Sequence, residues 1–188
     1  MDLGEDDTFD VTPNVTLFLL TPADVTPTYL KWMQDPRIQR FLESRRQEHS
    51  METLRVFVER LHDDPDTLMM GIRADDLHVG NIKLGPIERH HETAEIGLMI
   101  GEPAAWGKGV GRAAIQGVCE IARTRLGLRK VTAGASAKNI GSIRAFQSSG
   151  FEIEGRRQQQ LRGADGIEDL VLLGRVLSPA PRKPSPTT

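Results

Sequence analysis

Three glycines alternate with other residues in the segment Trp106-Gly-Lys-Gly-Val-Gly-Arg112, which follows an expected strand and opens an expected helix. Glycine lets the backbone pass close to a ligand because no side chain intervenes. The unpaired N–H groups of a first helical turn and the positive end of the helix dipole attract an anion. Lys108 and Arg112 add positive charge at the same place. The segment therefore predicts a site for a diphosphate group.

Three kinds of nucleotide site compete for this segment. A Walker A loop requires G-x-x-x-x-G-K-[ST], and the sequence contains no such string. Gly109, Gly111 and Ala114 fit the dinucleotide pattern G-x-G-x-x-A, but the next expected strand ends without the acidic residue that holds a ribose. Too little chain remains after it for a doubly wound sheet. The third kind is a coenzyme A site.

Composition excludes several other classes of function. The chain has 188 residues, with 24 Lys plus Arg against 26 Asp plus Glu, so its formal charge of −2 does not favour nucleic-acid binding. One cysteine excludes an intramolecular disulfide and a multi-cysteine metal site, and the five histidines lack ligand spacing, so we expect no metal. The acidic start is not a secretory signal and no apolar run spans a membrane, so we expect a cytoplasmic protein without a membrane contact.

The elements that must position these residues follow from hydrophobic periodicity and turn signals. Helices are expected over residues 21–35, 50–61, 107–126 and 140–149, and strands over residues 15–20, 68–72, 77–84, 93–100, 130–135, 151–161 and 170–177. Asp75-Asp76 and Gly85-Pro86 are expected to form turns of an antiparallel meander. This order predicts one α/β domain around a mixed sheet over residues 13–177. An acidic, flexible segment is expected over residues 1–12, and a disordered tail rich in Pro, Ser and Thr over residues 178–188.

The glycine segment resembles the pyrophosphate motif of the GNAT superfamily of acyl-CoA N-acyltransferases, written [RQ]-x-x-G-x-[GA]. Gly109 and Gly111 occupy its two fixed small positions, and Trp106 replaces the usual Arg or Gln, as in the subgroup similar to ribosomal-protein N-terminal acetyltransferases. Residues 94–100 resemble the strand before the loop, and residues 139–151 resemble the N-x-x-[SA]-…-G-F segment. The resemblance covers about residues 15–177.

The resemblance implies a single-domain GNAT fold, a mostly antiparallel mixed sheet flanked by helices, in which the fourth and fifth strands splay apart around the pantetheine arm of acetyl-CoA. Backbone groups of the first of these strands would pair with the arm as an added strand does. The implied coenzyme-binding residues are Leu98, Met99, Ile100, Trp106, Gly107, Lys108, Gly109, Val110, Gly111, Arg112, Asn139, Ser142 and Phe146.

The reaction that the resemblance implies is direct attack of a primary amine on the thioester carbonyl, for which the amine must lose a proton. Glu95 is the candidate base: alternation places it on one face with Gly97 and Met99, and burial in an apolar strand is expected to raise its pKa. The tyrosine that usually protonates the thiolate is replaced by Phe146, so Ser142 is the candidate acid. The competing interpretations are a solvated strand carboxylate for Glu95 and an ordinary helix start for Ser142.

The acceptor site of such folds lies between the first helices and the hairpin turns. We expect it to be lined by Tyr29, Trp32, Arg37, Phe41, Glu43, Arg45 and Arg46, with Glu88, His90 and His91 opposite. The arginines would bind the phosphates of a nucleotide-linked amino sugar, or they are exposed helix charges. His90-His91 is alternatively a solvated pair in a turn.

Three hypotheses about function remain open at this stage, two of which differ in the acceptor. The string Asn81-Ile-Lys-Leu-Gly-Pro-Ile87 is similar to GNAT members that acetylate amino sugars, which favours a small-molecule amine. The Trp106 variant of the loop favours a protein N-terminus with alanine or serine first. The missing tyrosine favours a third hypothesis, a non-catalytic sensor that binds acyl-CoA without transferring the acyl group. The resemblance also makes a homodimer plausible.

Overall fold

One sheet forms the centre of the fold. Because side chains alternate along a strand, apolar residues of its strands are buried on both of its faces. The computed structural model describes residues 8–177, and its strands are β1 (Thr8–Thr12), β2 (Val15–Leu19), β3 (Leu68–Ala74), β4 (Leu77–Glu88), β5 (Thr93–Ile100), β6 (Lys130–Ser136), β7 (Glu152–Gly163) and β8 (Gly166–Val176). They lie in the order β1-β2-β3-β4-β5-β6-β8-β7. Every neighbouring pair is antiparallel except β5 and β6, which are parallel.

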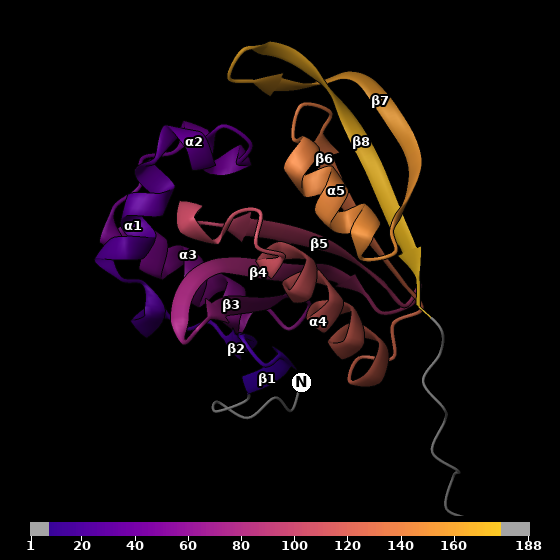
Figure 1. The fold of residues 1–188 in the computed structure, drawn as a ribbon, viewed down its shortest axis with the longest axis horizontal. Coiled ribbons are helices and arrows are strands. Elements are labelled where there is room, and N and C mark those ends of the chain that lie inside the picture. The colour runs from indigo at the N-terminus through magenta and orange to yellow at the C-terminus, as the bar shows by residue number, and fades with distance from the viewer. Residues whose placement is uncertain (1–7, 178–188) are drawn as a thin grey trace, which may run out of the picture.

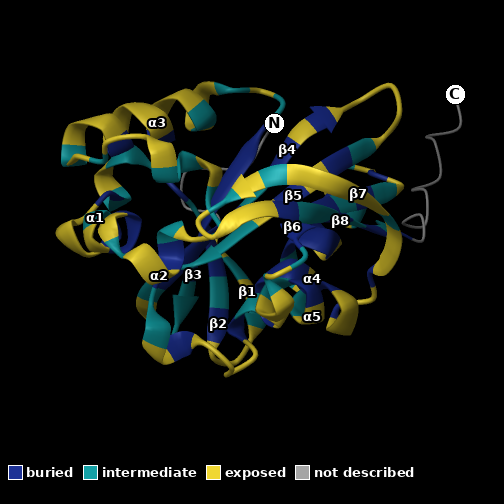
Figure 2. Cartoon of the chain, turned by 90° about the horizontal axis from the view of Figure 1, so that it is seen from above, coloured by how far each residue is buried: buried dark blue, intermediate teal, exposed yellow. Residues whose placement is uncertain are grey.

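Helices cover both faces of this sheet (Figure 1). They are α1 (Pro27–Gln34), α2 (Pro36–Gln39), α3 (Met51–Asp63), α4 (Val110–Thr124) and α5 (Ile140–Ser148), with short 3-10 turns η1 (Pro22–Asp24), η2 (Glu43–Arg46) and η3 (Pro103–Ala105). The apolar stripe of α4 and the inner side of α5 pack with one face of the sheet in the larger core. Residues of α1 and α3 pack with the other face in a smaller core. Figure 2 shows buried strands between helices whose outer faces are exposed.

The strands β5 and β6 part after a short parallel ladder. Only residues 93–95 of β5 pair with residues 130–132 of β6, although β5 continues to Ile100 and β6 to Ser136. The predicted mixed sheet with a splayed strand pair is therefore confirmed. Beyond Glu95 the facing edges of β5 and β6 do not pair with each other, which leaves room for an added chain between them.

Three expectations about the chain differ from the structure. Residues 8–12 of the segment expected to be flexible form β1, which pairs with β2. Gly85-Pro86 lies within β4 at an irregularity in the pairing, and the turn before β5 comes at residues 89–92. The helix expected from Gly107 begins at Val110, because the glycines before it adopt left-handed backbone angles. The tail at residues 178–188 lies outside the described residues.

The length and hydropathy of a helix decide whether it can cross a membrane. None of the helices within residues 8–177 is long and apolar enough to cross a membrane.

The packing of β1 on α4 gives a testable prediction. A Cβ at Gly117 would lie 2.5 Å from Cγ2 of Val11, so Gly117→Val should lower the free energy of unfolding by about 1–3 kcal/mol. Gln116→Val, on the exposed side of the same helix, should cost about 0.5 kcal/mol or less. Chemical denaturation measures both. Equal stabilities of the two variants, or no recovery when Val11→Ala is added to Gly117→Val, would contradict the packing of β1 on α4.

Candidate coenzyme and acceptor site

The start of α4 presents unpaired backbone N–H groups in an open loop. Gly109 is the residue before the helix, with φ of 82°, and Gly107 has φ of 72°. A Cβ at either position would meet no atom within 4 Å, so the left-handed backbone and not crowding requires glycine. The carbonyl of Gly109 accepts the first helical hydrogen bond, from Ala113, which leaves the N–H groups of the first turn free for an anion.

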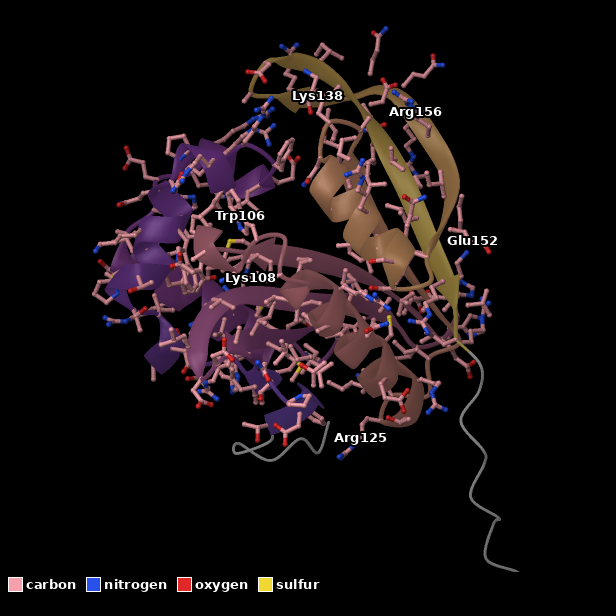
Figure 3. All side chains as sticks on the ribbon, viewed as in Figure 1. Trp106, Lys108, Arg125, Lys138, Glu152 and Arg156 are labelled. Carbon is pink, nitrogen blue, oxygen red and sulfur yellow. The ribbon has the colours of Figure 1, made fainter. Side chains whose placement is uncertain are left out.

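Gly111 fixes where these amides lie relative to the sheet. A Cβ at this position would stand 3.3 Å from Cδ2 of Leu98 and 3.8 Å from Cγ1 of Ile100. The first turn of α4 therefore packs directly on the last residues of β5. Trp106 makes a second connection, because its indole Nε1–H donates to the carbonyl of Ile100 at 2.9 Å. Figure 3 shows Trp106 and Lys108 in the loop between β5 and α4.

The free edge of β5 carries main-chain groups that face the gap. On its paired part, the carbonyl of Ala94 accepts from the hydroxyl of Thr132 on β6 at 3.4 Å. Because main-chain groups alternate in direction along a strand, those of Leu98 and Ile100 also face β6. Those of Met99 face β4, in agreement with the bond from Gly101 N–H to the carbonyl of Val79. An added chain in the gap would therefore bond Leu98 and Ile100, whereas Met99 contributes its side chain.

A cavity of about 430 Å³ occupies the gap and extends beneath the helices on the other face of the sheet. Its lining comes from α1, η2, α3, β3, β4, β5, β6, α5 and the β7–β8 hairpin. Gly97 and Gly134 lie two residues beyond the last ladder pair, Glu95 with Thr132. The nearest atoms to a Cβ at Gly97 would be 4.0 Å away, on Lys83. Gly97 therefore leaves its part of the gap open, whereas at Gly134 Cδ1 of Leu170 would lie 3.2 Å from a Cβ.

The opposite wall comes from the start of α5. Asn139 precedes the helix, and its Oδ1 accepts from the N–H of Ser142 at 3.1 Å. Asn139, Ser142 and Phe146 all line the cavity, as the sequence predicts for coenzyme-binding residues. Phe146 is 2% exposed and packs edge-to-face on Phe151 with ring centres 5.0 Å apart. It is therefore a rigid part of the wall, with no group that can donate a proton.

Leu98 and Met99 of β5 also line the main cavity, whereas Ile100 and the predicted residues from Trp106 to Arg112 are not in its described lining. Lys108, Gly109 and Val110 border a second cavity of about 400 Å³ on the side of β1 and β2. Arg112 is exposed, and its carbonyl accepts from the hydroxyl of Ser149 at 3.3 Å, which joins α4 to α5. Cys119 is buried within the core face of α4, and burial raises the pKa of its thiol to about 11, so the neutral form persists.

Glu95 lies at the point where the strands part. It shares a face with Gly97, as alternation predicts, and its Oε1 lies 3.9 Å from where a Cβ of Gly134 would stand. The burial expected for its carboxylate is wrong: the side chain is exposed. Glu95 is not among the described residues that line the cavity. Since its side chain is exposed, it borders the gap on the solvent side.

Only part of the predicted acceptor set meets at the cavity. Tyr29, Phe41 and Glu43 line it. Trp32 is buried and packs on Gly101 and His78, so it belongs to the smaller core. The remaining six predicted side chains are absent from the lining within residues 8–177. They are Arg37, Arg45 and Arg46 near the first helices, and Glu88, His90 and His91 near the turn before β5. The two histidines are exposed, with ring centres 4.9 Å apart, which agrees with the solvated-pair interpretation.

The three arginines expected to bind phosphate are engaged elsewhere. Arg37 pairs with Asp35, with Nη2 2.6 Å from Oδ2, and this guanidinium holds the pKa of the Asp35 carboxyl below its usual range. Arg45 is half-buried and donates to the carbonyls of Leu42, at 2.7 Å, and Arg162. Arg46 also reaches the carbonyl of Arg162, at 3.5 Å. Arg45 and Arg46 thus fasten η2 to the β7–β8 hairpin over the cavity.

A buried polar group at the inner end of the cavity was not predicted from the sequence. Asn81 is 3% exposed and lines the cavity beside Tyr29. Burial raises the pKa of Tyr29 to about 12, and the neighbouring Asn81 amide partly offsets this. The signal in the sequence is the polar Asn81 within the strand segment Val79-Gly-Asn-Ile-Lys-Leu84, where Lys83 is the other polar side chain.

Comparison with known proteins identifies the family. Residues 14–152 match the model of the acetyltransferase (GNAT) domain. The chain belongs to the GNAT acetyltransferase family. Among curated relatives of this GNAT protein, the human alpha/beta-tubulin-N-acetyltransferase 9 is 29% identical over 154 residues, which cover 73% of this chain and 72% of the relative.

Solved structures agree with the assignment. A ribosomal L7/L12 alpha-N-protein acetyltransferase, RimL, in complex with coenzyme A superposes with a TM-score of 0.83 at 19% identity, covering 91% of this chain and 98% of that one. A spermidine N-acetyltransferase from Vibrio cholerae in complex with CoA and spermine superposes with a TM-score of 0.78 at 20% identity, covering 88% and 97%. At these identities the likeness shows the fold.

The family assignment confirms the predicted reaction class. The chain is an acyltransferase of the N-acetyltransferase type, because its domain and its named relatives are N-acetyltransferases. The hypothesis of a non-catalytic acyl-CoA sensor is therefore set aside. Within residues 8–177, no group of three or more His, Cys, Asp or Glu is placed to hold a metal ion.

The left-handed glycine before α4 gives a prediction with a matched control. Gly109→Ala and Gly127→Ala both place alanine at a positive φ, 82° and 65°, where a Cβ meets no atom within 4 Å. Each should lower stability by about 1–2 kcal/mol. Only Gly109→Ala should weaken coenzyme A binding, by about tenfold or more in Kd, because only that glycine shapes the anion site. Isothermal titration calorimetry measures this. Equal affinities of the two variants for coenzyme A would refute the role of the loop.

Proposed function

We propose that this chain transfers an acetyl group from acetyl-CoA to the α-amino group of a peptide N-terminus. Three features support the donor: the free amides at the start of α4, the unpaired edge of β5 and the cavity in the gap between β5 and β6. The diphosphate would lie at the helix start. The pantetheine arm would lie along Leu98 and Ile100, with Asn139 on the other wall.

The observation that carries the choice of acceptor is the charge around the cavity. Its charged lining residues are Glu43, Glu48 and Lys83, while the three candidate arginines bond to other groups of the protein. A nucleotide-linked sugar needs several cationic partners for its phosphates, and within the described chain the cavity is lined by one lysine, Lys83, and by no arginine. An α-ammonium group, by contrast, is attracted by carboxylates at the cavity mouth.

The exposure of Glu95 favours the same acceptor. A peptide α-amino group has a pKa of about 7.7–8.0, so about 30% of it is neutral at pH 7.5, against about 0.1% of a lysine amine with a pKa of about 10.4. An exposed carboxylate is a weak base, which suits an amine that gives up its proton easily. Ser142, half-buried at the start of α5, has a hydroxyl at the coenzyme wall and is the group we assign to protonate the thiolate.

An amino sugar without phosphate is the second candidate acceptor. The observation that favours it is the Asn81 amide at the inner end of the cavity, because a sugar hydroxyl can accept a hydrogen bond there. A polyamine offers no oxygen to this amide.

The two assigned groups are tested separately by Glu95→Gln and Ser142→Ala. Glu95→Gln should lower kcat/KM about 10- to 100-fold at pH 7, because the amine then lacks its base. The loss should shrink as the pH rises through the amine pKa, since the acceptor then arrives neutral. Ser142→Ala should lower kcat by a similar factor at every pH. Thiol-release kinetics between pH 6.5 and 9 measure both, and unchanged rates in both variants would overturn the assignments.

The acceptor itself is tested with a set of amines. Thiol release from acetyl-CoA should be fastest with a peptide that begins with alanine or serine, slower with glucosamine and slowest with spermidine. Mass spectrometry should place the acetyl group on the peptide α-nitrogen. Faster turnover of glucosamine or spermidine than of every peptide would refute the proposed acceptor while leaving the reaction class intact.

A further inference from the structure

The amide nitrogen of Asn81 is a hydrogen-bond donor without a partner. Asn81 lies in the middle of β4 and is 3% exposed, yet within the described residues its Nδ2 has no hydrogen-bond acceptor. A buried polar group left unpaired costs about 1–3 kcal/mol. An apolar side chain of the same size would avoid this cost. The Tyr29 hydroxyl is near enough for the Asn81 amide to lower its pKa, but it makes no hydrogen bond of normal geometry with Nδ2. The donor is therefore available to an acceptor that the protein itself does not provide.

The orientation of the Asn81 amide is fixed by His78. The Nε2 atom of His78 lies 2.9 Å from Oδ1 of Asn81 and 3.0 Å from the carbonyl oxygen of Gly80. A carbonyl oxygen can only accept, so Nε2 carries the proton and donates to both oxygens. The His78 ring is held among Phe18, Tyr29 and Trp32, with centroids 5.3, 6.2 and 5.1 Å away. With Oδ1 held in this way, Nδ2 is the atom left free.

The free donor lies on the face of the sheet that α1 covers, beside the edge of β5 that faces the gap. Asn81 is the register partner of Met99 on β5, and both line the cavity. Its neighbours Ile82 and Leu84 point into the core under α4. The side chain of Asn81 therefore points to the opposite face, toward α1, where Tyr29 also lines the cavity. Neighbouring strands lie about 4.8 Å apart, so the amide stands one strand away from the edge of β5 that faces the coenzyme.

We propose that Asn81 is a specificity residue whose Nδ2 donates a hydrogen bond to an oxygen of the acceptor close to its reacting amine. This inference rests on the proposed N-acetyltransferase function. In a peptide N-terminus the oxygen is the carbonyl of the first residue, two bonds from the α-carbon that carries the amine. In an amino sugar it is a neighbouring hydroxyl. An alkylamine has no such oxygen and gains nothing from Asn81.

Asn81→Leu tests the proposal, because leucine has a similar size and no donor. The acceptors are an alanine-initiated tetrapeptide amide, glucosamine and n-butylamine. For each of them, kcat/KM of the variant is divided by that of the unaltered protein, so that differences in amine reactivity cancel. We expect a loss of about 5- to 100-fold for the acceptor that carries the recognised oxygen, and a change within about twofold for butylamine. Asn81→Ser, which keeps a shorter donor, should lose less than Asn81→Leu.

Thermal stability separates recognition from a structural role. Asn81→Leu removes an unpaired buried donor and also the acceptor Oδ1, but the His78 Nε2–H keeps its bond to the carbonyl of Gly80. The two effects offset each other, so the melting temperature of the ligand-free variant should change little. Thr67→Val is the matched control: Thr67 is 8% exposed, and its hydroxyl donates to Asp64 at 2.9 Å. It should lower the melting temperature and leave the ratios between acceptors unchanged. A lower melting temperature of Asn81→Leu with equal losses for all three acceptors would overturn the proposal.

The same data distinguish this inference from the proposed function. A selective loss with glucosamine, together with no turnover of any peptide, would refute the peptide acceptor and support Asn81 as the oxygen-recognising residue. Turnover of the peptide with the same rate in all Asn81 variants would support the proposed function and refute the role of Asn81. An absence of turnover with every amine, in a protein that binds coenzyme A, would refute both.

Discussion

The separation of β5 from β6 is the constraint on which the rest of the structure depends. A parallel ladder of three residue pairs holds the two strands together, and beyond it their facing edges do not bond to each other. Unpaired main-chain groups inside a protein require another partner. The gap, with Gly97 and Gly134 at its acceptor side, is shaped for a chain that supplies such a partner and then leaves. An amide-bearing arm of a coenzyme meets that requirement.

The neighbouring elements adapt to the same gap. Gly111 brings the start of α4 against the end of β5, so the first turn of the helix lies next to the free strand edge. Trp106 supports the loop by bonding the carbonyl of Ile100. On the far side, Arg45 fastens η2 to the β7–β8 hairpin, and the ion pair between Arg40 and Asp165, 2.6 Å apart, fastens the end of α2 to the same hairpin. These contacts hold α2 and η2 over the cavity and keep the side chains of Arg40 and Arg45 out of its lining.

The sequence predicts the elements that have strong hydrophobic periodicity or a recognisable motif. It does not predict elements or side-chain positions that depend on contacts between residues far apart in the sequence. The helix after Trp106 and the wall at Asn139 follow from local signals, so both could be predicted. β1 could not, because its few residues become a strand only through pairing with β2 and packing of Val11 on Gly117. The position of the arginines also depends on distant partners, such as the carbonyl of Arg162 for Arg45. The free amide of Asn81 is visible only when its neighbours are in place.

Amide hydrogen exchange with and without coenzyme A tests the central claim most directly, because it observes the edge of β5 itself. Coenzyme A should slow exchange at the N–H groups of Leu98, Ile100 and Gly111, which face the gap or the helix start. Met99, whose N–H faces β4, should change little. Protection at the amides of Leu98, Ile100 and Gly111 would support the account. Bound coenzyme A without protection at Leu98 and Ile100 would contradict it.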